Sequence, residues 1–272
     1  MDNALVNSEQ LPSGRLDRRK FIAAAGGIVA HLGVSGVVAP RVLQPRIKAV
    51  AFDAFPIFDP RPVFGLAERL FPGRGAALSD AWRTRQFEYQ WLRAIAGQYA
   101  DFLQATEAAL EFAAKRLELE LTPGRRSRLM QAYLELRAWT DVPPALAALK
   151  DAGLRLGLLS NMTFAMLEAG IRNSGLDGVF DQVVSTDQIR TYKPDPRAYQ
   201  LAIDAFGLER EEILFAAFAG WDAAGAKWFG YPTFWVNRLD FPAEELGVEP
   251  DGVGRGMADL VGFVSDVSSA SG

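Results

Sequence analysis

The sequence predicts an α/β protein in which a Rossmann-like parallel sheet core carries an inserted helical cap subdomain. Short apolar runs rich in strand formers alternate with helical segments, which is typical of a parallel sheet covered on both faces. These runs are residues 47–52, 154–159, 179–184, 213–219 and 233–236. Residues 60–141 differ, because aromatic and aliphatic residues recur there at helical spacing without a strand-like run.

The segment boundaries follow from this change of pattern. We assign residues 46–59 and 142–264 to the α/β core domain and residues 60–141 to a cap of about four helices. Within the core, helices are expected at 143–151, from 164 onward, at 195–206 and at 223–229. The Ser- and Gly-rich residues 265–272 are expected to form a loose tail.

Composition narrows the functional classes. The 272 residues are 49% hydrophobic and 23% charged, which allows a substantial core and argues against disorder. A net charge of −4 gives no electrostatic reason to expect a nucleic acid partner. The absence of cysteine excludes disulfides, thiolate nucleophiles and zinc–thiolate sites.

The N-terminal residues 1–39 resemble a bacterial twin-arginine export signal. Residues 18–22 (RRKFI) precede an uncharged, weakly hydrophobic, Gly- and Ala-rich run at 23–39. This predicts a periplasmic protein that uses the twin-arginine export machinery, with the signal cleaved near Pro40 or retained as a membrane anchor. The only histidine, His31, lies in this segment. The exported chain would therefore lack both His and Cys, so carboxylates must carry any chemistry.

Polar residues follow several of the predicted strands. Asp53 ends the first strand, Ser160-Asn161 the second, and Asp222 follows the strand at 213–219. Lys193 stands just ahead of a predicted helix. Each of these could be a turn residue, a helix cap or a solvated side chain. Together they indicate a site, because ligands of open α/β sheets bind at the carboxyl ends of the strands.

With these motifs the chain resembles the haloacid dehalogenase superfamily, and within it the type II L-2-haloacid dehalogenases. The resemblance covers residues 46–264. Its core motifs are Phe52-Asp53, Leu159-Ser160-Asn161, Tyr192-Lys193-Pro194-Asp195 and Gly220-Trp221-Asp222. Further matches are Phe71-Pro72-Gly73-Arg74-Gly75, Trp82-Arg83, Gln86-Phe87-Glu88-Tyr89, Trp91-Leu92-Arg93, Gln104-Ala105-Thr106-Glu107 and Trp235-Val236-Asn237-Arg238.

The resemblance implies hydrolytic dehalogenation of short-chain L-2-haloalkanoic acids, with no metal and no other cofactor. Asp53 would be the nucleophile that displaces the halide and forms an ester, which water then hydrolyses. Lys193 would supply the positive charge that keeps this carboxylate ionised. Asp222 would position the hydrolytic water or hold Lys193.

The other site residues are implied in the same way. Ser160 and Asn161 would bind the substrate carboxylate, with Asn161 also beside the halide. Arg83 from the cap would face the departing halide. The apolar wall of the substrate pocket would consist of Phe55, Phe87, Phe102 and Trp221, and Tyr199 would make a polar contact with the substrate.

The phosphatase branch of the superfamily is the main competing interpretation. Phosphoryl transfer there needs a second Asp two residues after the nucleophile, to protonate the leaving oxygen. It also needs Mg²⁺ held by acidic residues. Here Phe55 occupies the first position, and Asp222 has no adjacent acidic partner. The sequence therefore disfavours a phosphatase.

Two departures from the dehalogenase pattern leave alternatives open. The loop after Asp53 lacks the usual Gly-Thr pair and is one residue shorter (AFPIFD, residues 54–59), and Ala217 and Ala219 replace the usual Ser and Asn. Lost donors would slow the hydrolytic step. The chain could thus be an active dehalogenase, another hydrolase of the superfamily, or a catalytically weak or inactive binding descendant. The aromatic cap helices could also bury the interface of a homodimer.

Overall fold

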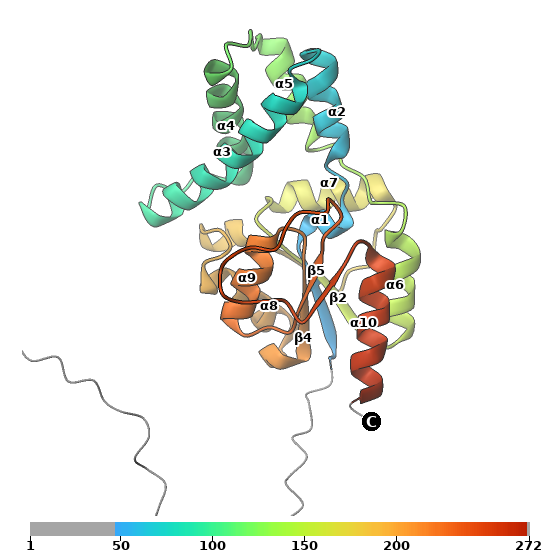
Figure 1. Cartoon of the computed structure of the whole chain (residues 1–272). Coiled ribbons are helices and arrows are strands. Elements are labelled where there is room, and N and C mark those ends of the chain that lie inside the picture. Colours follow the sequence, from blue (N-terminus) through green and yellow to red (C-terminus); the bar gives the residue numbers. More distant parts are fainter. Residues whose placement is uncertain (1–46, 271–272) are drawn as a thin grey trace, which may run out of the picture. The chain divides into compact units, whose positions relative to one another are not determined.

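The protein is described by a computed structural model that covers residues 47–270, so the predicted export signal at 1–39 lies outside the described residues. Six parallel strands form one sheet in the order β3-β2-β1-β4-β5-β6. The strands are β1 (Ala49–Phe52), β2 (Arg155–Ser160), β3 (Gln182–Ser185), β4 (Ile213–Ala217), β5 (Thr233–Val236) and β6 (Gly252–Gly254). This confirms the predicted α/β fold class (Figure 1).

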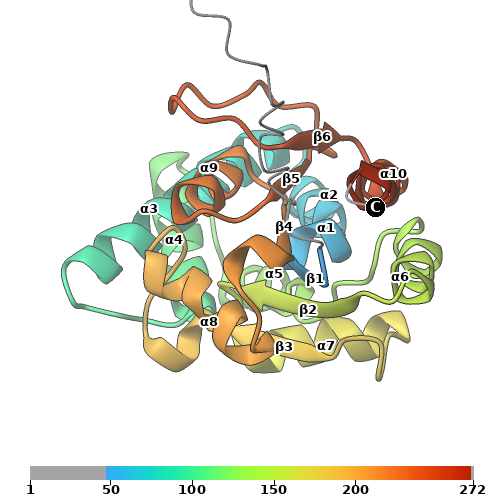
Figure 2. The same ribbon diagram turned by 90° about the horizontal axis from the view of Figure 1, so that it is seen from below.

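Helices cover both faces of the sheet, and the two-residue period of the strands explains why. Val50 and Phe52 of β1 point into the cluster formed with α6 (Val142–Asp151), α7 (Phe164–Ser174) and α10 (Met257–Ala270). Ala49 and Ala51 point to the opposite cluster, formed with α8 (Pro196–Phe206) and α9 (Gly220–Phe229). Figure 2, viewed from below, shows the two sets of helices on either side of the strands.

Four helices form the cap: α2 (Arg61–Leu70), α3 (Gly75–Ile95), α4 (Phe102–Arg116) and α5 (Pro123–Ala132). Asp101 and Thr122 start α4 and α5, because their side chains accept hydrogen bonds from the first-turn backbone N–H groups. Trp82 anchors the cap interior. It is fully buried, donates from Nε1 to the carbonyl of Thr106 at 2.8 Å and packs edge-on against Tyr133.

The two segments that join cap and core run side by side. Phe58 and Ala138 form an antiparallel bridge, and Trp139 donates from Nε1 to the carbonyl of Phe55 at 3.0 Å. The short helix α1 (Ala54–Ile57), which the sequence pattern did not predict, lies between β1 and this junction. The nucleophile loop is therefore tied to the base of the cap.

The C-terminal end differs from the predicted loose tail. Residues 265–270 continue α10, because Met257, Leu260 and Val264 bury one face of that helix in the core. Serine hydroxyls on its last turns donate to carbonyls four residues earlier, so the Ser-rich composition does not break the helix. Strand β6 was also missed, since its Gly-rich sequence carries no strand signal. Across residues 47–270, no helix combines the length and apolar character that a membrane crossing requires.

Candidate active site

The site is centred on Asp53, at the carboxyl end of the central strand β1. Asp53 is 8% exposed, and its carboxylate caps α1, with Oδ2 accepting from the backbone N–H of Phe55 at 3.2 Å. Its other oxygen, Oδ1, accepts from the Lys193 ammonium at 2.9 Å. Both oxygens are thus oriented by donors from the protein, as a carboxylate nucleophile requires.

Lys193 is the cation on which the site depends. Its ammonium is buried and donates to Asp53, to Asp222 Oδ2 at 2.6 Å and to the carbonyl of Leu159 at 3.2 Å, which uses all three protons. Burial alone would lower the pKa of Lys193, but the charges of Asp222 and Asp53 outweigh burial and hold this pKa above its usual value. Lys193 is therefore a permanently charged anchor for both carboxylates.

Asp222 is the second carboxylate of the cluster, in the first turn of α9. Its Oδ1 accepts from the hydroxyl of Tyr199 at 2.7 Å, and its Oδ2 accepts from Lys193. Burial, opposed by Lys193 and reinforced by the charge of Asp53, raises the pKa of Asp222 to about 6. A raised pKa is expected here, because two buried carboxylates share the single positive charge of Lys193.

The end of β2 contributes Ser160 and Asn161. Ser160 Oγ accepts from the N–H of Met162 at 3.1 Å, which leaves its proton available to a ligand. Asn161 Oδ1 accepts from the backbone N–H of Lys193 at 2.9 Å, so the orientation of its amide is fixed by a group that can only donate. Its Nδ2 donates to Gln90 of the cap at 3.2 Å and keeps one further proton.

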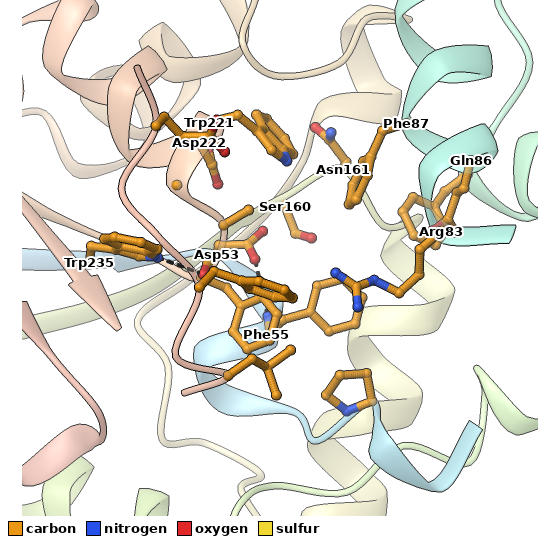
Figure 3. A pocket seen from close by; sticks show the side chains of 18 of the residues that line it. Asp53, Phe55, Arg83, Gln86, Phe87, Ser160, Asn161, Trp221, Asp222 and Trp235 are labelled. Carbon is orange, nitrogen blue, oxygen red and sulfur yellow. Dashed lines mark hydrogen bonds between the residues drawn. The ribbon is translucent and has the colours of Figure 1, made fainter. Parts of the chain in front are cut away.

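The cap closes over these residues and forms a cavity of about 260 Å³. Figure 3 shows the Arg83 guanidinium reaching into this cavity from the cap, on the side away from Trp235. The guanidinium lies 5.5 Å from the ring centres of both Phe64 and Phe241. Within residues 47–270 no ion pair involves Arg83, so its N–H groups can receive an anion.

Nine of the eleven predicted site residues line the cavity. They are Asp53, Phe55, Arg83, Phe87, Phe102, Ser160, Asn161, Trp221 and Asp222. Lys193 lies behind Asp53 and acts through its contact with that carboxylate. Tyr199 does not line the cavity. It is fully buried and supports Asp222, which corrects the predicted contact of Tyr199 with the substrate.

Several lining residues were not predicted. The cap and joining segments add Pro60, Phe64, Gln86 and Tyr133, and the core adds Phe218, Ala219, Gly220, Trp235, Leu239, Phe241, Pro242 and Glu244. Trp235 could have been found, because it falls near the end of an apolar strand. The segment 239–244 follows no pattern that places it over the site.

Comparison with known proteins agrees with this geometry. Residues 47–230 match the family model described as haloacid dehalogenase-like hydrolase. The chain belongs to the haloacid dehalogenase-like hydrolase family. It is 45% identical over 206 residues to the (S)-2-haloacid dehalogenase of Pseudomonas sp. (strain YL), covering 75% of this chain and 89% of the relative. It is 42% identical over 207 residues to haloacetate dehalogenase H-2 of Moraxella sp. (strain B), and the match covers 76% of this chain and 92% of that relative.

Solved structures show the same family fold. The L-2-haloacid dehalogenase RSc1362 superposes with a TM-score of 0.79 at 45% identity, covering 81% of this chain and 99% of that one. The L-2-haloacid dehalogenase from Xanthobacter autotrophicus, with chloropropionic acid covalently bound, superposes with a TM-score of 0.74 at 36% identity. Coverage is 80% of this chain and 98% of that structure.

The acidic side chains of the described residues show which charged groups surround Asp53. Between residues 47 and 270, no three or more His, Cys, Asp or Glu side chains gather in a group suited to hold a metal ion. The cluster of this family member instead places the Lys193 ammonium between its two carboxylates. The position two residues after Asp53, where a phosphatase needs an acid, carries Phe55 at the cavity wall.

Proposed function

We propose that this chain hydrolyses L-2-haloalkanoic acids through an ester intermediate on Asp53. The observation that carries the proposal is the Asp53 carboxylate, held by Lys193 and by the Phe55 N–H at the base of a largely aromatic cavity. The Arg83 guanidinium supplies a positive charge elsewhere in the same cavity. Support also comes from the named activities of the relatives and from the covalent chloropropionic acid complex.

The first half-reaction follows from the placement of charge. An Asp53 oxygen attacks the carbon that bears the halogen, and the electron pair of the carbon–halogen bond leaves with the halide. Ser160 Oγ–H and the free Nδ2 proton of Asn161 are placed to bind the substrate carboxylate. Arg83 stabilises the departing halide, because its guanidinium lines the cavity and is not neutralised by an ion pair within residues 47–270.

The second half-reaction returns the free carboxylate. Water adds to the ester carbonyl of Asp53, and the 2-hydroxy acid leaves with the oxygen that was bonded to its α-carbon. The Lys193 ammonium next to Asp53 stabilises the oxyanion that develops there. Asp222 lies on the other side of that ammonium and lines the cavity, so it is placed to orient the water and accept its proton.

Substitution of the nucleophile tests the proposal. Asp53→Asn should retain the fold and lose halide release from L-2-chloropropionate, because an amide is a far weaker nucleophile. Asp204→Asn, an exposed change of the same chemical kind, serves as the control and should release halide at the wild-type rate. Turnover by the Asp53 variant, with deamidation excluded by mass spectrometry, would refute the mechanism.

We also propose that residues 1–39 direct export to the periplasm through the twin-arginine machinery. The support is the pair Arg18-Arg19 ahead of the weakly hydrophobic run at 23–39. Changing both arginines to lysine keeps the charge and should trap the protein in the cytoplasm, as measured by cell fractionation. Continued export of this variant would contradict the assignment.

Finally, we propose that the protein forms a homodimer through its cap. Leu92 and Ile95 near the end of α3 are 59% and 87% exposed, which is unusual for large apolar side chains close together on one helix. Changing both to Glu should convert a dimer to a monomer in light scattering. A wild-type protein that is monomeric at micromolar concentration would refute this proposal.

A further inference from the structure

We infer that the site is built for 2-haloacids whose α-carbon carries an aryl-methyl or similarly bulky apolar group, in preference to short-chain haloacids. The inference rests on the proposed function and deepens it by naming the substrate class. Three features support it: the room in the cavity, the position of its aromatic residues relative to Asp53, and the fixation of the loop that completes the wall.

The cavity has more room than a small haloacid needs. Its volume of about 260 Å³ is roughly twenty times the ~10–15 Å³ that one water needs on the same measure. The α-methyl group of 2-chloropropionate leaves much of this space to water. A phenyl ring on that methyl group adds six carbon atoms that can occupy it.

The order of the strands in the sheet shows on which side of the reacting carbon the additional room in the cavity lies. Along the carboxyl edge of the sheet, the ends of β2, β1, β4 and β5 follow one another. Ser160 and Asn161 end β2, and Asp53 ends β1 between β2 and β4. A substrate whose carboxylate binds at the β2 side of Asp53 thus directs its α-substituent towards β4 and β5.

The side chains at the ends of β4 and β5 are aromatic. Phe218 follows β4 and packs against Phe55, with ring centres 5.7 Å apart and planes tilted by 47°. Trp235 of β5 donates from Nε1 to the carbonyl of Phe218 at 2.9 Å, so its indole has no free donor to offer the cavity. Aromatic rings pack favourably edge-on or offset on such a wall, beyond the gain from buried area alone.

A fixed loop completes the wall. Asn237 accepts from the N–H of Phe241 at 3.0 Å and donates to its carbonyl at 2.8 Å. Arg238 donates to Asp141 and, at 2.9 Å, to the carbonyl of Pro56 in the nucleophile loop. The backbone of the loop at Phe241 is therefore held before a ligand arrives, which limits the entropy that this segment loses on binding.

Binding of unreactive acids tests the inference separately from catalysis. Propionate and 3-phenylpropionate, which carry no halogen, should be titrated by calorimetry against the full chain. We expect 3-phenylpropionate to bind at least ten-fold more tightly, because several additional apolar carbons are buried. In turnover, kcat/KM for L-2-chloro-3-phenylpropionate should exceed that for L-2-chloropropionate by a similar factor.

A matched pair of variants tests whether Phe218 causes the preference for the larger acid. Phe218→Ser should lower the ratio of the two affinities by about ten-fold. The control Phe164→Ser changes an exposed Phe on α7, away from the cavity, and should keep the wild-type ratio. If Phe218→Ser fails to fold, the wild-type comparison of the two acids still decides the question.

The outcomes separate this inference from the proposed function. Equal affinities for the two acids, together with release of halide from 2-chloropropionate, would overturn the inference and leave the function intact. Tighter binding of 3-phenylpropionate without halide release from any haloacid would support the aromatic wall and refute the dehalogenase mechanism. An unchanged affinity ratio in a folded Phe218→Ser variant would overturn the assignment of the wall.

Discussion

Replacing Lys193 with Met tests the charge cluster most directly. The change keeps an apolar chain of similar length and removes one ammonium from between two carboxylates. At an effective dielectric constant of about 20, ion pairs at 2.9 and 2.6 Å contribute about 6 kcal/mol each before desolvation is counted. Desolvation offsets most of this, but the variant leaves two buried carboxylates without a counter-charge. We expect a loss of about 3–5 kcal/mol in the free energy of unfolding at pH 7.5.

Urea unfolding followed by circular dichroism measures this loss, and halide release measures the activity. The control is Lys227→Met, which breaks a partly exposed pair with Asp251 at 2.8 Å and should cost about 1 kcal/mol or less. Adding Asp222→Asn to Lys193→Met should recover part of the stability and none of the activity, because Asp53 still lacks its cation. A single variant within about 1 kcal/mol of the control would refute the reasoning.

Three further predictions concern pH, metal and the ester. Burial raises the pKa of Asp222 to about 6, so the native state holds a proton that the unfolded chain releases near pH 4. As the pH rises from 4 to 6, the free energy of unfolding of the wild type should therefore fall by up to about 3 kcal/mol more than that of Asp222→Asn, as measured by urea unfolding. Halide release should persist in EDTA, and strict dependence on Mg²⁺ would favour a phosphatase. Rapid mixing with an L-2-haloacid should give a burst of halide release, and mass spectrometry should find an acyl adduct on the peptide that carries Asp53. Ala219→Asn should shorten the lifetime of this adduct. The absence of both the burst and the adduct would contradict slow hydrolysis of the ester.

The sequence predicted the charged part of the site because each member marks the end of a strand or the start of a helix. Asp53, Ser160 and Asp222 meet because the carboxyl ends of parallel strands share one edge of the sheet. Lys193 reaches the same edge from the segment before α8. Local pattern placed these residues at the ends of strands, and the predicted parallel arrangement brings those ends to one edge.

The part of the aromatic wall beyond β4 and β5 could not be predicted in the same way. Phe218 and Phe241 lie on irregular segments whose course depends on long-range contacts, such as that of Arg238 with Asp141. Tyr199 was misplaced for a related reason. Its position on α8 was clear, but sequence does not reveal whether a helix directs a side chain into the cavity or behind Asp222. The serine-rich end was misjudged because it continues a helix whose buried residues, Met257, Leu260 and Val264, all precede it in the chain.

The two alanines that depart from the dehalogenase pattern are not equivalent in the structure. Ala217 is the last residue of β4 and is fully buried, whereas Ala219 lines the cavity. Position 219 could therefore present a donor directly to a ligand in the cavity, whereas a donor at 217 would act from inside the buried core. Part of the lost support is replaced by the Phe55 N–H, which binds Oδ2 in the shortened loop. Displacement of halide depends on Asp53 and Lys193, which are intact, so the substitution at 219 should act on hydrolysis of the ester rather than on its formation.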